Sequence, residues 1–293
     1  MKIVIGCDVD PNLPAPLMRR PDANVWQCLD NIDRLLERSG GELPPITWLI
    51  RSDESIRFST GAYDSGFTAK ERLWRSLEDR GHELGWHFHA MSFVHGRGQF
   101  GLDPDPAWLA AAHGALAAHF RIRATRSGWD YCNNQLLPRL DALGVDVDFS
   151  ALPGNIIWQQ SGDDAVVVDW SRCPRAPYHP SARDYQQPGT LGLLEVPITQ
   201  FRNSPLGAAT RMLWRMKRGN WSMKGLRTKT RMLTQPWTTL PDLPDPRDPS
   251  AGVCAFFFHP EDLHPDGIAN GLRNIAKLAR LPGAQFVKAS DVL

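Results

Sequence analysis

Cysteine is scarce in this sequence, and the cysteines present are not arranged for cross-linking. The 293 residues contain five cysteines, an odd number, and none of them belongs to a Cys-x-x-Cys pair. Disulfide-rich secreted domains and thiolate zinc sites depend on closely or regularly spaced cysteines. Both classes are therefore excluded, and we expect reduced thiols in a cytoplasmic protein.

Long apolar runs and an excess of charge are also missing. No apolar run approaches the roughly 20 residues that cross a bilayer as a helix. The chain enters a short apolar strand at once and reaches Asp8 too early for the apolar core of a signal peptide. The formal net charge is +1, so no global field attracts nucleic acid. We expect a cytoplasmic location and no nucleic-acid partner.

Acidic residues are absent from one long stretch, residues 201–240. This stretch breaks the rhythm of the chain and a Pro-rich loop follows it, so we interpret residues 205–250 as an insertion. The stretch 201–240 is rich in basic residues, and three tryptophans are interleaved with them. The basic residues are Arg202, Arg211, Arg215, Lys217, Arg218, Lys224, Arg227, Lys229 and Arg231, and the tryptophans are Trp214, Trp221 and Trp237. Two interpretations remain open. The segment is either a solvated helix pair with its aromatic rings packed inward, or a surface for an anionic lipid carrier or the inner face of a membrane.

Apolar strands and amphipathic helices alternate along the rest of the chain. We predict strands at 2–7, 46–50, 82–88, 122–126, 145–149, 165–169, 191–198, 253–258 and 285–287, and helices at 24–39, 68–80, 106–120, 134–143 and 267–280. This alternation favours a parallel sheet covered by helices. No internal repeat or domain boundary is visible, so residues 1–293 are expected to form one α/β domain.

Side chains that bind metal ions gather at the ends of two predicted strands. Asp8 and Asp10 end the first strand, and the run from Gly81 to His89 contains His87 and His89 at the end of the third. Side chains at positions i and i+2 of a strand share a face, so both histidines can point at one ion. Asp10, His87 and His89 would supply three ligands and leave a position for water. Zinc fits this set, although Co, Ni, Mn or Fe would also tolerate it.

These motifs resemble those of the polysaccharide deacetylase superfamily (NodB homology, carbohydrate esterase family 4). Cys7-Asp8-Val9-Asp10-Pro11 is similar to the acidic motif that follows its first strand, and Gly81 to His87 is similar to its histidine motif. The family has a second ligand histidine four residues after the first. Met91 stands at that position here, so His89 is the available substitute. The other matches are Arg126-Ser127-Gly128-Trp129, Asp169-Trp170 and the strand that ends in His259.

The resemblance implies an irregular (β/α)7-type barrel that removes an N-acyl group, for which N-acetyl is our first expectation, from a saccharide with the help of one divalent metal ion. Asp8 would then be the general base. His259 can donate a proton to the departing amine, and Arg126 can hold Asp8 ionised. Asp169 is expected to set the tautomer of His259. Trp86, Trp129, Trp170 and Tyr178 lie close to the motifs and are the expected stacking residues for the sugar.

The substrate expected for a cytoplasmic enzyme of this kind is a nucleotide- or lipid-linked precursor of a surface polysaccharide or lipopolysaccharide. Two alternatives stay open. One is hydrolysis of a non-sugar amide, as in an amidohydrolase or deformylase. The other is a non-catalytic saccharide-binding protein on a degenerate deacetylase scaffold. The absence of a histidine at position 91 supports this alternative.

Overall fold

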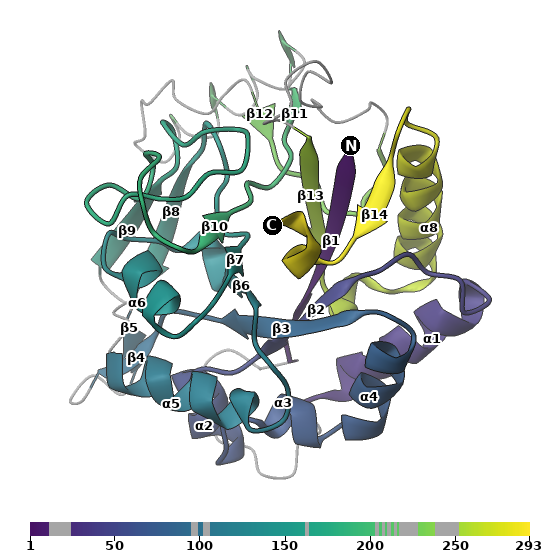
Figure 1. Ribbon diagram of the computed structural model, residues 1–293, viewed down its shortest axis with the longest axis horizontal. Coiled ribbons are helices and arrows are strands. Elements are labelled where there is room, and N and C mark those ends of the chain that lie inside the picture. The colour runs from purple at the N-terminus through teal and green to yellow at the C-terminus, as the bar shows by residue number, and fades with distance from the viewer. Residues whose placement is uncertain are drawn as a thin grey trace.

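A curled parallel sheet forms the centre of the molecule (Figure 1). The computed structural model describes residues 1–11, 25–94, 99–101, 106–161, 164–202, 228–237 and 252–293, together with residues 205, 206, 209, 212, 213 and 216. The strands of the sheet follow the order β10-β7-β6-β3-β2-β1-β13, and β14 pairs with β1. Their bounds are β1 Lys2–Val9, β2 Thr47–Arg51, β3 Glu83–Phe88, β6 Ala124–Ser127, β7 Val147–Asp148, β10 Leu194–Glu195, β13 Val253–Phe258 and β14 Gln285–Val287.

Strand β1 is the most heavily paired strand. One of its edges pairs with β13 from Lys2 to Cys7. The other edge is divided, because residues 2–4 pair with β14 and residues 6–9 pair with β2. All these pairings are parallel, and every residue from Ile3 to Val9 is buried. The uninterrupted apolar run of β1 fits a strand covered on both faces.

The sheet closes on itself through an irregular segment after β10. Thr199 donates its N–H to the carbonyl of Ala255 in β13 at 2.9 Å, and the Ala255 N–H donates to Thr199 Oγ1 at 3.0 Å. A parallel bridge also joins Ile198 to Ala255. One side of the barrel is therefore a short bridge rather than a full strand. The predicted irregular (β/α)7-type barrel is confirmed.

Helices surround the curled sheet (Figure 1). They are α1 Asp30–Arg38, α2 Glu54–Thr60, α3 Ser65–Thr68, α4 Glu71–Asp79, α5 Pro106–Ala117, α6 Leu136–Ala142 and α8 Pro265–Ala279. Helix α1 buries Ile32 and Leu35 and ends at Arg38, and the turn that follows contains Gly40 and Gly41, whose φ angles of 66° and 78° suit glycine. Among the described residues, no helix has both the length and the apolar character needed to cross a membrane.

Among the described residues, three antiparallel strand pairs lie outside the barrel sheet. They are β4 Ser92–Val94 with β5 Gln99–Gly101, β8 Ile156–Ser161 with β9 Asp164–Asp169, and β11 Phe201–Arg202 with β12 Thr228–Lys229. The strand predicted at 165–169 therefore exists, but its placement in the barrel was wrong because its partner is β8. Helix α2 was not predicted.

The predicted insertion, residues 205–250, begins shortly after β11 and contains β12. Trp214, Trp221, Arg211, Arg215, Lys217, Arg218, Lys224, Arg227 and most of 205–250 lie outside the described residues. Within the described part, Trp237 is 5% exposed and its ring packs on Phe256 at a centroid distance of 5.1 Å. The inward packing of one tryptophan is thereby confirmed. Leu206 and Leu213 are exposed by 75% and 66%.

Candidate active site

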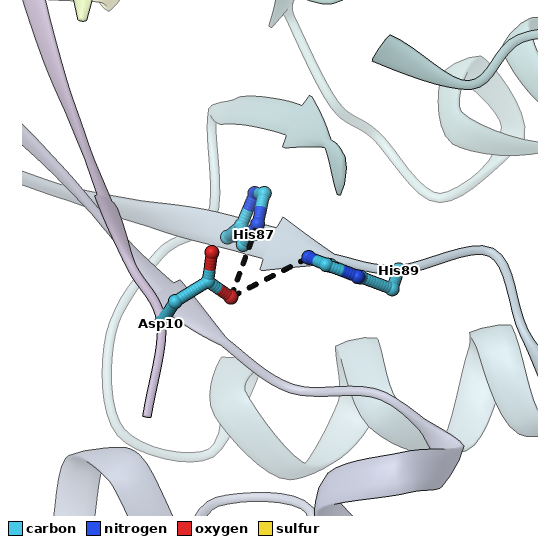
Figure 2. Close-up of side chains that lie close together, drawn as sticks. All are labelled: Asp10, His87 and His89. Atoms are coloured by element: carbon cyan, nitrogen blue, oxygen red, sulfur yellow. Dashed lines mark ion pairs between the residues drawn. The ribbon is translucent and has the colours of Figure 1, made fainter. Parts of the chain in front are cut away.

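Two strands separated only by β2 bring a carboxylate and two imidazoles together. Asp10 follows β1, His87 lies near the end of β3, and His89 follows β3. Asp10 Oδ1 is 3.5 Å from His87 Nε2 and 3.4 Å from His89 Nε2, and dashed lines in Figure 2 mark these two ion pairs. One ligand atom from each of the three residues lies within 4.8 Å of the others. The spacing of two along β3 thus places both rings on one face, as the sequence predicted.

The environment of His87 prepares its Nε2 atom as a metal ligand. His87 Nδ1 lies 2.7 Å from the carbonyl oxygen of Arg126. A carbonyl can only accept, so Nδ1 carries the proton and the Nε2 lone pair is free. Nε2 is buried and has no hydrogen-bond partner among the described residues. A carbonyl that fixes the tautomer of a histidine is the usual outer support of a metal-bound imidazole, so these residues fit a divalent ion.

The charge states of the other two residues also suit a metal ion. Burial would raise the pKa of Asp10, but His87 and Arg51 outweigh it and hold the pKa well below its usual range. Burial lowers the pKa of His89 to about 4, and the nearby Arg51 charge acts in the same direction. At neutral pH, Asp10 is therefore ionised and His89 is neutral. Metal binding requires these protonation states.

A buried ion pair lies beside the cluster. Asp8 is fully buried and accepts a hydrogen bond on Oδ2 from Arg126 Nη1, as the sequence predicted. Arg126 Nη2 also donates to Asp130, and the guanidinium carbon lies 3.9 Å from the centroid of the Phe257 ring. The second oxygen of Asp8, Oδ1, has no hydrogen-bond partner in the part of the chain that the structure describes. This oxygen is available to accept a proton.

His259 follows β13 and reaches the same ion pair. Its Nε2 lies 3.6 Å from Asp8 Oδ2, and its Nδ1 lies 3.1 Å from Asp262 Oδ2. The carboxylate of Asp262 also accepts the backbone N–H of His259 at 3.2 Å. Asp169 instead accepts the N–H of Ser171 on Oδ1 at 2.8 Å. The prediction that Asp169 sets the tautomer of His259 was wrong, because Asp262 occupies that position.

Three of the four predicted stacking residues were wrong. Trp86 and Trp170 are fully buried, with indole N–H groups bonded to the carbonyls of Ser52 at 2.8 Å and Asp130 at 2.9 Å. Tyr178 is 6% exposed and donates its hydroxyl to the carbonyl of Tyr185 at 2.8 Å. These rings belong to the core and cannot receive a sugar face.

Trp129 remains as a stacking candidate. Its side chain is 39% exposed, and its ring centroid lies 4.4 Å from that of His89. The backbone turns sharply here, since Trp129 and Asp130 have φ angles of 57° and 54°. A side chain at Gly128 would meet the ring of His89 at 2.0 Å, so only glycine fits. The turn therefore presents one exposed indole directly beside a candidate metal ligand.

Two residues of the site, Arg51 and Asp53, were missed in the sequence. Arg51 ends β2 and donates to Asp10 at 2.7 Å, and Asp53 accepts the backbone N–H of His89 at 2.9 Å. Their position at a strand end is the signal that identified the other polar residues. Met91 is 7% exposed and donates its N–H to the carbonyl of His89 at 2.7 Å, within a tight turn.

The comparisons with known proteins yielded matches only among solved structures. No family model and no curated protein matches the sequence. A crystal structure from Mycobacterium smegmatis, assigned as a polysaccharide deacetylase, aligns at a TM-score of 0.53 and 15% identity, over 99% of this chain and 88% of that chain. The chain therefore shares the fold of that structure.

Two further matches have lower TM-scores. A Bordetella bronchiseptica structure assigned as a polysaccharide deacetylase involved in O-antigen biosynthesis has a TM-score of 0.37 and 13% identity, over 88% of this chain and 70% of that one. The α-amylase AmyC from Thermotoga maritima has a TM-score of 0.49 and 10% identity, over 99% and 74%. At these values neither match adds to the argument.

Proposed function

We propose that this chain is a metal-dependent hydrolase of the polysaccharide deacetylase superfamily that removes an N-acyl group, in the first instance N-acetyl, from an amino sugar. The observation that carries the proposal is the Asp10–His87–His89 cluster beside the Asp8–Arg126 ion pair. The shared fold with the mycobacterial structure supports the same reaction class. The cluster also favours an enzyme over a binding protein, because His89 takes the place of the missing histidine.

The reaction divides into an electrophilic part and two proton transfers. Asp10, His87 and His89 would hold the divalent ion, proposed to be zinc, and a bound ion polarises the acyl carbonyl and lowers the pKa of water. Asp8 accepts the proton of the attacking water at Oδ1, while Arg126 keeps its carboxylate charged and oriented.

The second proton goes to the leaving nitrogen. An amine is a poor leaving group until it is protonated, so a general acid is required. His259 donates from Nε2, and Asp262 stabilises the imidazolium through Nδ1–H. The indole of Trp129 supplies a flat apolar surface for the sugar ring beside these groups. Each of the two transferred protons thus has a residue in place.

The substrate proposed is a nucleotide- or lipid-linked precursor of a surface polysaccharide or lipopolysaccharide. Exposed Leu206 and Leu213 lie on a segment rich in basic residues and without acids, which supports contact with an anionic lipid carrier or membrane surface. Co-sedimentation with anionic and neutral liposomes tests this partner. Leu206→Ser/Leu213→Ser should weaken binding to anionic vesicles, and equal sedimentation with both lipids would contradict the proposal.

The function is tested by metal content and acetate release together. Mass spectrometry of the purified protein should find about one transition-metal ion per chain, lost in Asp10→Ala and His89→Ala. Acetate release should be measured on N-acetylated amino sugars, free and nucleotide-linked, with Asp8→Asn as the inactive variant that still holds metal. Asp184→Asn, which changes an exposed ion pair with Arg172, is the matched control.

The same assays separate the alternatives. Metal binding without turnover of any acylated sugar, but with turnover of formylated or cyclic amides, would indicate a non-sugar amidohydrolase. Binding of saccharides with neither metal nor turnover would indicate a degenerate scaffold. Either result would contradict the proposed reaction.

A further inference from the structure

Arg51 is a buried cation in direct contact with a candidate metal ligand. Its side chain ends β2, and its Nη1 donates to Asp10 Oδ1 at 2.7 Å. The same oxygen lies 3.5 Å from His87 Nε2 and 3.4 Å from His89 Nε2. Arg51 therefore contacts the one carboxylate oxygen that faces both imidazoles.

The position of Arg51 is fixed by two further partners. Its Nε donates to Asp53 Oδ2 at 2.8 Å, and its Nη2 donates to Ser55 Oγ at 2.9 Å. Arg51 is only 6% exposed, and Asp53 and Ser55 are fully buried. Asp53 is fixed in turn, because it caps α2 through the Ile56 N–H at 3.0 Å and accepts the His89 N–H. The guanidinium cannot move into solvent without breaking this network.

Arg51 also stays charged in this buried place. A guanidinium keeps its proton in proteins, and the carboxylates of Asp53 and Asp10 accept from it at 2.8 Å and 2.7 Å. The three ligands carry one negative charge, on Asp10, since both imidazoles bind metal in the neutral form. A divalent ion at this site would therefore meet a fixed positive charge that shares its only anionic ligand.

We propose that Arg51 competes with the metal ion for Asp10 and so lowers the affinity of the site, while Asp53 limits this competition by engaging the guanidinium. The inference rests on the proposed metal site. An ion that shares its carboxylate ligand keeps more of its charge for the acyl oxygen and the bound water. Arg51 acts through Asp10 and is a positioning residue.

A purely structural role for Arg51 makes the opposite prediction. If the guanidinium served only to hold Asp10 in place, its removal would loosen the ligand and weaken metal binding. The competition proposed here requires that its removal tighten metal binding. The sign of the change therefore separates the two roles.

The experiment measures the Zn²⁺ dissociation constant by competition with a chromophoric chelator at one fixed pH. We expect Arg51→Gln to bind Zn²⁺ at least about tenfold more tightly than the wild type, and Arg51→Lys, which keeps the charge, to stay within about threefold. Asp53→Asn should bind more weakly, because Asp10 is then the one carboxylate among the described residues that still pairs with Arg51. Arg57→Gln changes an exposed arginine paired with Glu54 on α2 and should leave the dissociation constant unchanged.

The double variant Arg51→Gln/Asp53→Asn covers the case in which Arg51→Gln does not fold. It removes both charges of the buried pair, and it should bind Zn²⁺ more tightly than Asp53→Asn alone. Folding of each variant is verified by circular dichroism. Unchanged or weaker binding on loss of Arg51, in a wild type that binds Zn²⁺ through His87, would overturn this inference alone. Zn²⁺ binding that is absent, or unaffected by His87→Ala, would overturn the proposed metal site and this inference with it.

Discussion

Two buried carboxyl groups on adjacent strands make the stability of this protein decrease as pH rises. Asp148 in β7 and Glu195 in β10 are paired residues of adjacent strands, and both are fully buried. Asp148 accepts from the hydroxyl of Thr125 at 2.8 Å and from the Ser150 N–H at 3.0 Å. Glu195 Oε1 accepts the Ala151 N–H at 2.8 Å.

The proton of this pair belongs to Glu195. Burial raises the pKa of Glu195 well above its usual value of 4.5, and the charge of Asp148 and a hydrogen bond to it act in the same direction. The Ala151 N–H and the more distant charge of Arg126 oppose the shift without cancelling it. Glu195 is therefore neutral in the native state at pH values where the unfolded chain has already lost the proton.

The sign and size of the effect follow from proton linkage. Above pH 4.5 the unfolded state binds fewer protons than the native state, so the free energy of unfolding falls as pH rises. One proton corresponds to a slope of at most about 1.4 kcal/mol per pH unit, which persists until the native pKa is reached. Glu195→Gln removes the ionisable group and keeps a donor for Asp148. Its free energy of unfolding should lack this contribution.

Urea unfolding between about pH 5 and pH 8 measures the difference in free energy of unfolding between the wild type and Glu195→Gln directly. The wild type should lose stability relative to Glu195→Gln as pH rises, and the gap should widen steadily. Glu42→Gln, at an exposed position, should run parallel to the wild type. Parallel curves for wild type and Glu195→Gln would refute the assignment of the proton to the native pair.

Three further predictions concern the site. Gly128→Ala places a Cβ 2.0 Å from the His89 ring, so Zn²⁺ affinity should fall by about tenfold or more in a chelator competition. Asp262→Asn removes the charge that supports the His259 imidazolium, so kcat/KM should fall up to about a hundredfold while metal content stays constant. Trp129→Ala should raise KM for a sugar substrate by several-fold, as expected for losing about 1 kcal/mol of stacking, with little change in kcat. A change in kcat alone would place Trp129 in another role.

The clustering of Asp10, His87 and His89 was predictable because each residue follows an apolar strand. In a parallel sheet such positions share one edge, and the period of two along a strand sets which side chains share a face. The same period explains one error. Successive side chains of a strand point to opposite faces of the sheet. Because the His87 ring faces the site, the indole of the preceding Trp86 must face the helices.

The remaining errors concern pairing that the pattern of residues does not specify. The strand ending in Asp169 has the composition of a barrel strand, and only its antiparallel pairing with β8 removes it from the barrel. Asp262, rather than the predicted Asp169, lies beside His259, because the short 3-10 helix Pro260–Asp262 brings the Asp262 carboxylate back onto the His259 ring. Such a local turn is decided by backbone geometry over a few residues, which spacing alone does not reveal.

The divided edge of β1 has a consequence for the order in which the protein is assembled. Asp10 and the two histidines lie on β1 and β3 or directly after them, and these strands are joined through β2, which lies between them in the sequence as well as in the sheet. The remaining partners of β1 are β13 and β14, which follow all the other strands of the sheet in the sequence. Contacts so distant in sequence form slowly, because the intervening chain must first be ordered. His259 therefore reaches Asp8 only after the chain between β3 and β13 has been ordered, and a chain truncated before β13 would retain the metal-binding residues but lack the acid-base pair.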